Sequence, residues 1–148
     1  MYKTEAIITK VENFKENHLS ITVYSSEYGQ KSLVVFGGKS KKKNSIYVKG
    51  SLNNIEFDDN NVCLSSTSNN TFKWFLFSKY ELKTIDYFCF LINKLLFLAD
   101  QNSNVVSYYL LLISKLNERS NYLPELLLLE IEILKASGYQ PDLNESVL

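Results

Sequence analysis

A glycine pair followed by closely spaced lysines is the stretch of this sequence best suited to binding chemistry. Residues 34–45 read VVFGGKSKKKNS, so an apolar run ends in Gly37 and Gly38 and continues into Lys39, Ser40 and three further lysines. These residue types can hold phosphate groups, either those of a nucleotide in a phosphate-binding loop or those of a nucleic-acid backbone. The spacing and the rest of the chain have to distinguish the two.

The spacing does not support a nucleotide-binding loop. Such a loop needs a glycine five positions before its second glycine, and a helix that begins at the lysine. The first of these positions holds Leu33, and the residues after Ser40 are three lysines, Asn44 and Ser45. They make a poor first helical turn, because the helix dipole favours acidic residues there. We therefore interpret the stretch as a basic loop that contacts a phosphate backbone, through Lys39, Lys41, Lys42 and Lys43.

Charge is unevenly distributed along the chain. Residues 1–50 contain nine Lys and four Glu, which gives +5, and residues 51–148 contain seven basic and twelve acidic side chains, which gives −5. A basic face confined to one module is typical of proteins that bind a polyanion. A solvated, lysine-rich surface without a ligand is the alternative that the charge pattern leaves open.

Residues that could support catalysis or bind a metal are few. His18 is the only histidine and lies in the polar segment KENHLS, where we expect a solvated turn residue. Cys63 and Cys89 are 26 positions apart without Cys-x-x-Cys spacing, which favours buried reduced thiols over a zinc site. Glu130 and Glu132 are two positions apart, so a helix directs them to different faces. We therefore expect a binding protein, with no enzymatic activity, metal or cofactor.

The first half of the chain predicts β-strands, because it contains short runs rich in β-branched and aromatic residues between polar segments. Residues 25–30, SSEYGQ, predict a turn in which Gly29 adopts a positive φ, and a second turn is expected at residues 58–61. Several short strands at this spacing favour a small barrel or sandwich. The expected strands are 4–11, 19–25, 31–37, 45–49, 53–57, 62–66 and 71–77.

The hydrophobic period changes from two to nearly four after about residue 78. Apolar stripes predict packed helices within 85–96, 105–116 and 123–138, the last with Pro124 in its first turn and Gly138 as C-cap. Residues 85–99 are apolar but short for a membrane span, and Asn93 with Lys94 interrupts them. The first residues contain no signal-peptide pattern. We expect a soluble, cytoplasmic protein without membrane contact.

Two stretches near the ends of the chain carry a resemblance to a known family. Residues 2–45 contain a TEAI strand, a polar turn with EN, a strand before an acidic-aromatic-Gly turn, and a strand that runs into the lysine-rich loop. Residues 125–146, ELLLLEIEILKASGYQPDLNES, contain a helix that closes with a GY-x-x-D-L turn at Gly138, Tyr139, Asp142 and Leu143. Both stretches resemble the bacterial DNA repair and recombination protein RecO, and the apolar helices at 81–116 are similar in kind to its helical segment.

The resemblance implies an α+β architecture, with an N-terminal OB-type β-barrel over residues 1–77 and an α-helical domain over residues 78–148. It also implies a non-catalytic protein that binds single- and double-stranded DNA, anneals strands, and works with RecR, the single-stranded DNA-binding protein SSB and RecA in the RecF pathway. The DNA-binding residues would be Lys39, Lys41, Lys42 and Lys43, on the loop where the family is basic. Tyr24, Tyr47 and Lys49 would share that face.

The helical half is the expected binding site for a partner. In the family it receives the acidic, apolar-ended tail of SSB, and such a tail needs a hydrophobic pocket with a cation on its rim. We expect Lys115 or Arg119 to lie beside an apolar pocket built from helices 103–116 and 123–137. The alternative is a non-catalytic protein-interaction module, in which the helical half binds a partner peptide and the lysines serve solubility.

The C-terminal end departs from the family pattern. Family members continue after the GY-x-x-D-L turn into a zinc-binding or zinc-derived segment and more helices, whereas this sequence stops at Leu148. Ser146 lies about where the first zinc-ligand cysteine is expected. We therefore expect a truncated or naturally reduced homologue without a metal site.

Overall fold

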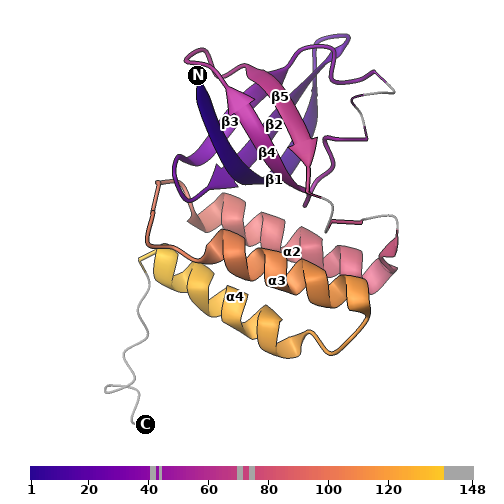
Figure 1. Ribbon diagram of the computed structural model, residues 1–148, viewed down its shortest axis with the longest axis vertical. Helices are drawn as coiled ribbons and strands as arrows, with labels where there is room; N and C mark the ends of the chain where they lie inside the picture. The colour runs from indigo at the N-terminus through magenta and orange to yellow at the C-terminus, as the bar shows by residue number, and fades with distance from the viewer. Residues whose placement is uncertain (41–42, 44, 70–71, 74–75, 139–148) are drawn as a thin grey trace.

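A curved β-sheet lies above a layer of helices in the computed structural model (Figure 1). The structure describes residues 1–40, 43, 45–69, 72–73 and 76–138. The strands are β1 (Tyr2–Phe14), β2 (His18–Ser25), β3 (Gly29–Val35), β4 (Leu52–Phe57) and β5 (Cys63–Ser68). The helices named in Figure 1 are α2 (Lys79–Leu95), α3 (Val105–Glu118) and α4 (Leu123–Ala136).

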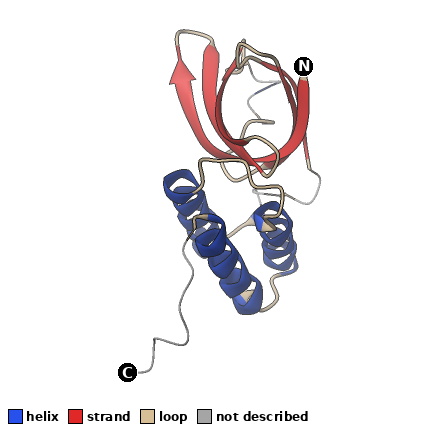
Figure 2. Cartoon of the chain, turned by 90° about the vertical axis from the view of Figure 1, so that its left-hand side faces the viewer, coloured by secondary structure: helices blue, strands red, loops and turns tan. Residues whose placement is uncertain are grey.

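The strands form an OB-type barrel. Their order in the sheet is β3-β2-β1-β4-β5, and the long strand β1 pairs antiparallel with both β2 and β4. A parallel bridge between Val34 and Val62 then brings the two edge strands together, and the ring is visible in Figure 2. This order and this closure are those of a five-stranded Greek-key barrel. The expected α+β architecture, a barrel followed by helices, is confirmed.

A β-bulge in β1 allows that strand to bend. The pairing with β2 shifts between Ile8 and Lys10, so Thr9 is the extra residue. Bulges of this kind increase local twist and redirect a side chain. Here the bulge turns the buried Thr9 toward helix α2, where its hydroxyl lies 2.5 Å from the side-chain oxygen of Asn93.

Two hydrophobic clusters form the core. The first fills the barrel and includes Ile8, Ile21 and Leu33, all fully buried. The second lies between the barrel and the helices, and it joins barrel residues such as Ile7 to helix residues such as Phe88. Because this second cluster crosses from barrel to helices, the division at residues 77 and 78 stays a prediction, although the last strand does end at Ser68 and α2 begins at Lys79.

Two of the expected strands are wrong. Residues 45–49 form turns and connecting backbone, because Tyr47 packs into the barrel core instead of leading a paired strand. The described residues between 71 and 77 are not in a strand either. Phe72 and Phe77 pack edge to face with ring centroids 5.7 Å apart, and both belong to the cluster between barrel and helices.

The other predicted turns and caps agree with the structure. Gly29 has a φ of 72° in the turn between β2 and β3. Asp58 accepts backbone hydrogen bonds from Asn60 and Val62 through its carboxylate, which closes the turn before β5. Pro124 lies in the first turn of α4, and Gly138 follows this helix with a φ of 92°. Tyr139, Asp142, Leu143 and Ser146 lie outside the described residues.

Among the described residues, no helix combines the length and the hydropathy needed to cross a membrane.

Candidate nucleic-acid interface

Three lysines converge at one end of the barrel. The Lys39 ammonium donates a hydrogen bond to the backbone carbonyl of Lys15, at 3.1 Å, and so joins the loop after β3 to the turn between β1 and β2. The Lys43 ammonium donates to the carbonyl of Phe36 at 3.0 Å, which folds the loop back on the end of β3. We call Lys15, Lys39 and Lys43 the basic end of the barrel. Lys41 and Lys42, which the sequence assigns to the same loop, lie outside the described residues.

Aromatic rings lie next to this basic end. Phe14 and His18 are partners in the β1–β2 register, and the His18 ring meets Phe36 edge to face at 5.0 Å. The Phe36 side chain is 53% exposed, and the Lys15 ammonium lies 5.3 Å from the centre of the Phe14 ring. Exposed rings beside cations are what single-stranded nucleic acid needs, because bases stack on the rings while cations neutralise phosphates.

His18 has a structural role that the sequence did not show. It begins β2 and is half-buried, so the expectation of a solvated turn residue is wrong. Its Nδ1 accepts a hydrogen bond from the backbone N–H of Gly37 at 2.9 Å. Gly37 has a φ of 68°, and a Cβ on Gly38 would lie 2.9 Å from the Leu19 side chain. The glycine pair therefore serves the turn and its close packing, and the described residues 37–40 form a turn and a bend instead of a helix start.

Tyr24 and Tyr47 do not lie on an exposed face, which corrects the expectation that they share one with the lysines. Tyr47 is 7% exposed, and its hydroxyl lies 3.5 Å from the Cys63 sulfur inside the barrel. Burial raises the pKa of Tyr47 far above its ordinary value. Tyr24 is 1% exposed and packs in the cluster between barrel and helices. Both rings pack in the core and are not available for stacking in this structure.

Lys49 lies away from the basic end. Its ammonium forms an ion pair with Asp86 of α2 at 3.1 Å. It also lines a cavity of about 510 Å³ between α2 and the strands β1 and β2. The structure therefore divides the predicted lysines between two places. Lys39 and Lys43 lie at the basic end of the barrel, and Lys49 lies beside α2.

The thiols have no geometry for catalysis. Cys63 and Cys89 are both free and buried. Burial raises the pKa of the Cys89 thiol to about 12, so it stays protonated and unreactive at neutral pH. Among the residues that the structure describes, no cluster of three His, Cys, Asp or Glu side chains could hold a metal ion.

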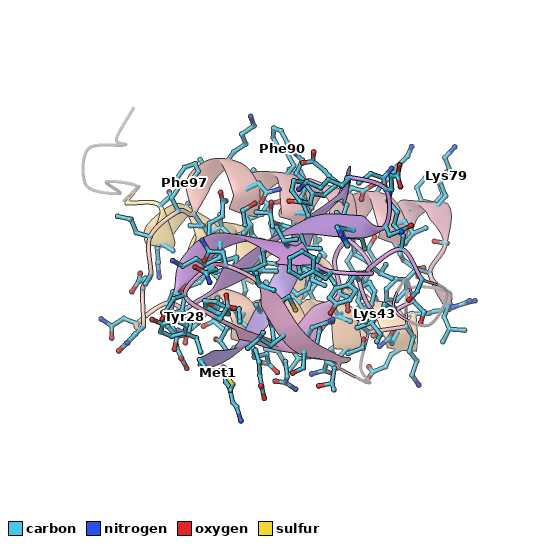
Figure 3. All side chains as sticks on the ribbon, turned by 90° about the horizontal axis from the view of Figure 1, so that it is seen from above. Met1, Tyr28, Lys43, Lys79, Phe90 and Phe97 are labelled. Atoms are coloured by element: carbon cyan, nitrogen blue, oxygen red, sulfur yellow. The ribbon has the colours of Figure 1, made fainter. Side chains whose placement is uncertain are left out.

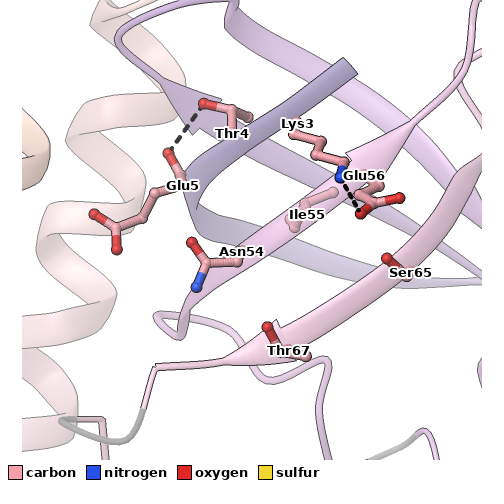
Figure 4. Close-up of a pocket in the computed structure, with 8 residues that line it drawn as sticks. All are labelled: Lys3, Thr4, Glu5, Asn54, Ile55, Glu56, Ser65 and Thr67. Atoms are coloured by element: carbon pink, nitrogen blue, oxygen red, sulfur yellow. Dashed lines mark hydrogen bonds and ion pairs between the residues drawn. The ribbon is translucent and has the colours of Figure 1, made fainter. Parts of the chain in front are cut away.

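A shallow pocket lies over β1, β4 and β5 (Figure 4). Its volume is about 370 Å³, and Lys3 forms an ion pair with Glu56 across it at 3.3 Å. The remaining lining residues are Thr4, Glu5, Asn54, Ile55, Ser65 and Thr67. With its cation paired to Glu56, the pocket provides no open cationic surface for a phosphate.

Lys115 and Arg119 lie near the end of α3. The Lys115 ammonium is 3.9 Å from the carboxylate of Glu118. Arg119 ends the helix in the left-handed conformation, with a φ of 55°, and its guanidinium donates to the carbonyl of Leu76 at 3.4 Å. Neither residue lines any of the four described cavities, so their role beside an apolar pocket stays a prediction.

The fold is an OB-type barrel followed by a helical part, and OB-type barrels are a fold that proteins use to bind oligonucleotides. Residues 1–61 match the family model described as "Recombination protein O N terminal". The match covers the chain from β1 to the turn before β5 and supports a RecO-type N-terminal domain. No curated protein matches the sequence.

Phe14, Lys15 and Phe36 were missed as candidate contacts. Along β3, Leu33 and Val35 are buried while the residues between and after them are not, so the two-residue alternation already directs Phe36 outward. Phe14 follows the same alternation from the outward-facing Glu12. The alternation was therefore a usable signal for the rings. The approach of Lys15 to Lys39 is a contact between positions 24 residues apart, which no local pattern contains.

Proposed function

We propose that this RecO-type protein is a non-catalytic DNA-binding mediator of recombination, which anneals strands and holds their backbone at the basic end of the barrel. The observation that supports this proposal is the convergence of Lys15, Lys39 and Lys43 beside the exposed Phe36 ring. The family model supports a role in recombination and repair. The proposed contact residues are Lys39, Lys41, Lys42 and Lys43, now joined by Lys15 and Phe36.

The lysines would act mainly by displacing counterions. Each phosphate neutralised on a single strand adds about 0.7 to the slope of log affinity against log salt concentration. Among the described residues, Lys39 and Lys43 donate to backbone carbonyls and neither forms an ion pair, so contact with a phosphate would not have to displace a described carboxylate. The Phe36 ring would add stacking that accepts any base, because every base has a π-face.

The test is a fluorescence-anisotropy titration of a labelled oligonucleotide at several salt concentrations. The variant replaces Lys39, Lys41, Lys42 and Lys43 with Ala, and we expect weaker binding to all sequences and a slope lower by up to about 3. The matched control removes four other lysines, all exposed and outside the loop: Lys73, Lys79, Lys83 and Lys135. Equal affinities and slopes for wild type and the loop variant would place the DNA-binding face elsewhere.

The partners follow from the family resemblance and are part of the proposal. They are single- and double-stranded DNA, and the proteins RecR, RecA and SSB, the last through its C-terminal tail, with Lys115 and Arg119 as the cations for that tail. A tail peptide should lose affinity when both residues are replaced by Ala, because its acidic groups lose their counter-charge. Unchanged peptide affinity would remove these residues from the partner site.

A second candidate function, a protein-interaction module, is favoured by the surface of α4. Leu123, Leu127 and Ile131 are each about half exposed, as are Leu128 and, to a smaller degree, Leu134. Contiguous exposed leucines of this kind mark interaction sites. This reading predicts that Leu127→Asp combined with Ile131→Asp abolishes partner binding while DNA affinity is unchanged, and loss of DNA affinity in that variant would contradict it.

A further inference from the structure

The cavity between α2 and the barrel has the composition of a second strand-binding surface. Its volume is about 510 Å³, and Lys10, Lys49, Phe90 and Lys94 are among its lining residues. Thr9, Val11, Glu12, Thr22, Gln30 and Asn93 complete the lining. We call this cavity the α2 groove. It is distinct from the basic end, because none of Lys15, Lys39 and Lys43 lines it.

Phe90 gives the α2 groove an open aromatic face. Its side chain is 57% exposed although it lies on a helix whose buried side is rich in apolar residues. The Lys94 ammonium lies 5.9 Å from the centre of its ring. Figure 3 labels Phe90 on α2, on a different side of the barrel from Lys43. An exposed ring with a cation beside it is the arrangement on which a nucleic-acid base stacks while its phosphate is neutralised.

The lysines of the groove are held in place by exposed carboxylates. Lys10 pairs with Glu12 at 2.8 Å and Lys49 with Asp86 at 3.1 Å. All four side chains of these two pairs are about half exposed. Ion pairs at such positions are weak, about 0.2–1 kcal/mol. A phosphate can therefore replace either carboxylate as the partner of its lysine.

The strand register connects the α2 groove to the basic end. Lys10, Glu12 and Phe14 face outward in one column of β1, opposite Thr22, Ser20 and His18 of β2. Residues two apart on a strand are about 7 Å apart, so this column spans about 13 Å from Lys10 to Phe14. One end of the column is at the groove and the other is beside Lys15. A strand that follows the β1–β2 hairpin around the barrel can contact both locations.

We propose that the α2 groove binds a single-stranded nucleic acid as the continuation of the path that begins at the basic end, with one base stacked on Phe90 and phosphates on Lys49 and Lys94. The inference rests on the proposed DNA-binding function and assigns a second part of the site to it. Stacking on Phe90 requires a base that is not already stacked in a duplex. The groove therefore gives the protein a preference for single strands that the basic end alone does not supply.

The experiment compares anisotropy titrations of oligothymidylates of about 4 and about 16 nucleotides, the range of site sizes of OB-folds, together with a duplex of the same length as the longer one. The variants are Phe90→Ala and the pair Lys49→Ala with Lys94→Ala. The matched control for the ring is Phe97→Ala, because Phe97 is 58% exposed and lies outside the groove. The control for the lysines is the pair Lys3→Ala with Lys135→Ala, which are also exposed and outside it.

We expect Phe90→Ala to weaken binding of the longer strand about ten-fold or more, since stacking contributes about 1–3 kcal/mol per base, and to leave the duplex and the shortest strand within about two-fold. The lysine pair should lower the salt slope for the longer strand by about 1.4. Glu12→Gln should act in the opposite direction and tighten binding, by about two- to five-fold, because it frees Lys10 from a weak ion pair. A gain of affinity cannot result from damage to the fold.

The outcomes separate this inference from the proposed function. If the wild-type protein binds no strand at all, the proposed function itself fails. If the loop lysines matter while Phe90→Ala and the groove lysines behave like their controls, the strand does not enter the α2 groove and the inference is wrong. Equal losses for single strands and duplex in Phe90→Ala would contradict base stacking and leave only a general contact.

Discussion

The junction between the barrel and the helices and the basic end of the barrel are held together in different ways. At the junction with the helices, groups of one part donate to backbone carbonyls of the other: the Gln30 backbone N–H donates to the carbonyl of Phe97 at 3.0 Å, and the buried Tyr109 hydroxyl donates to the carbonyl of Gly50 at 2.5 Å. At the basic end, flexible ammonium groups donate to carbonyls of exposed turns. The junction is buried and allows no added atoms, whereas the basic end is open to water and to ligands.

This difference shows which substitutions should affect folding and which should affect binding. A close-packed interior responds to the addition or loss of single atoms. An exposed loop usually changes stability by no more than about 0.5 kcal/mol when its side chains are shortened. Changes at the junction should therefore appear in the free energy of unfolding, and changes at the basic end should appear in affinity and salt dependence.

The largest effect expected at the junction is that of Gly29→Ala. Gly29 has a φ of 72°, and an added Cβ would lie 2.5 Å from the carbonyl oxygen of Phe97 and 2.7 Å from the nitrogen of Ala99. Backbone atoms cannot move aside cheaply, so the left-handed conformation and the clash act together. We expect a loss of about 2–5 kcal/mol, from about 1–2 for the conformation and about 1–3 for overpacking, measured by urea denaturation.

Gly37→Ala is the matched control at the basic end. Gly37 has a φ of 68°, nearly the same as Gly29, but no atom lies within 4 Å of the position of its added Cβ. Only the conformational cost of about 1–2 kcal/mol should remain. If the two variants lose the same stability, close packing at the turn between β2 and β3 is not what distinguishes the junction from the basic end.

The second prediction concerns the link between the bulge of β1 and α2. The Asn93 amide donates to the carbonyl of Thr9 at 3.3 Å, and the Thr9 hydroxyl donates to Asn93 Oδ1. Asn93→Ala should cost about 1–3 kcal/mol, because it leaves a buried backbone acceptor without a partner. Thr9→Val should cost less, and a double-mutant cycle should give a coupling energy of at least about 0.5 kcal/mol. Additive losses would mean that the two side chains do not act as one link.

Local patterns in the sequence were enough for much of the fold. Short runs of β-branched and aromatic residues predicted strands β1 to β5, and the apolar period of nearly four predicted helices α2, α3 and α4. The same patterns failed at Tyr47 and at residues 71–77, where aromatic residues that are typical of strands pack as single anchors in a core. Over a few residues, a β-strand has the same composition as a loop that places one aromatic side chain in the core. Only the tertiary structure therefore distinguishes them.

The candidate site was less predictable for a related reason. The run of lysines identified the loop that contains Lys39 and Lys43, whereas Lys49, which the resemblance placed on the same face, forms an ion pair with Asp86 of α2. Asn93 looked like an interruption of an apolar helix, and the structure gives it a partner 84 positions away in the bulge of β1. Sequence spacing identifies which residues share a face, but not which distant face they meet.

The smallest expected effect is that of Tyr47→Phe, and it tests whether Tyr47 belongs to the core or to the binding face. The ring fills the barrel beside Cys63, and the hydroxyl makes a weak contact of 3.5 Å with the Cys63 sulfur, which also reaches the carbonyl of Ser65. Removing the hydroxyl keeps the ring and its packing, so the loss of stability should stay below about 1 kcal/mol. Tyr47→Ala should lose more stability than Tyr47→Phe, because a cavity of aromatic size should cost about 3–5 kcal/mol.

Single-strand affinity measured by anisotropy should be unchanged in Tyr47→Phe, since the hydroxyl does not face solvent. Tyr47→Phe could instead weaken strand binding several-fold while its unfolding curve matches that of the wild type. In that case Tyr47 contacts the ligand and belongs to the binding face, not to the barrel core.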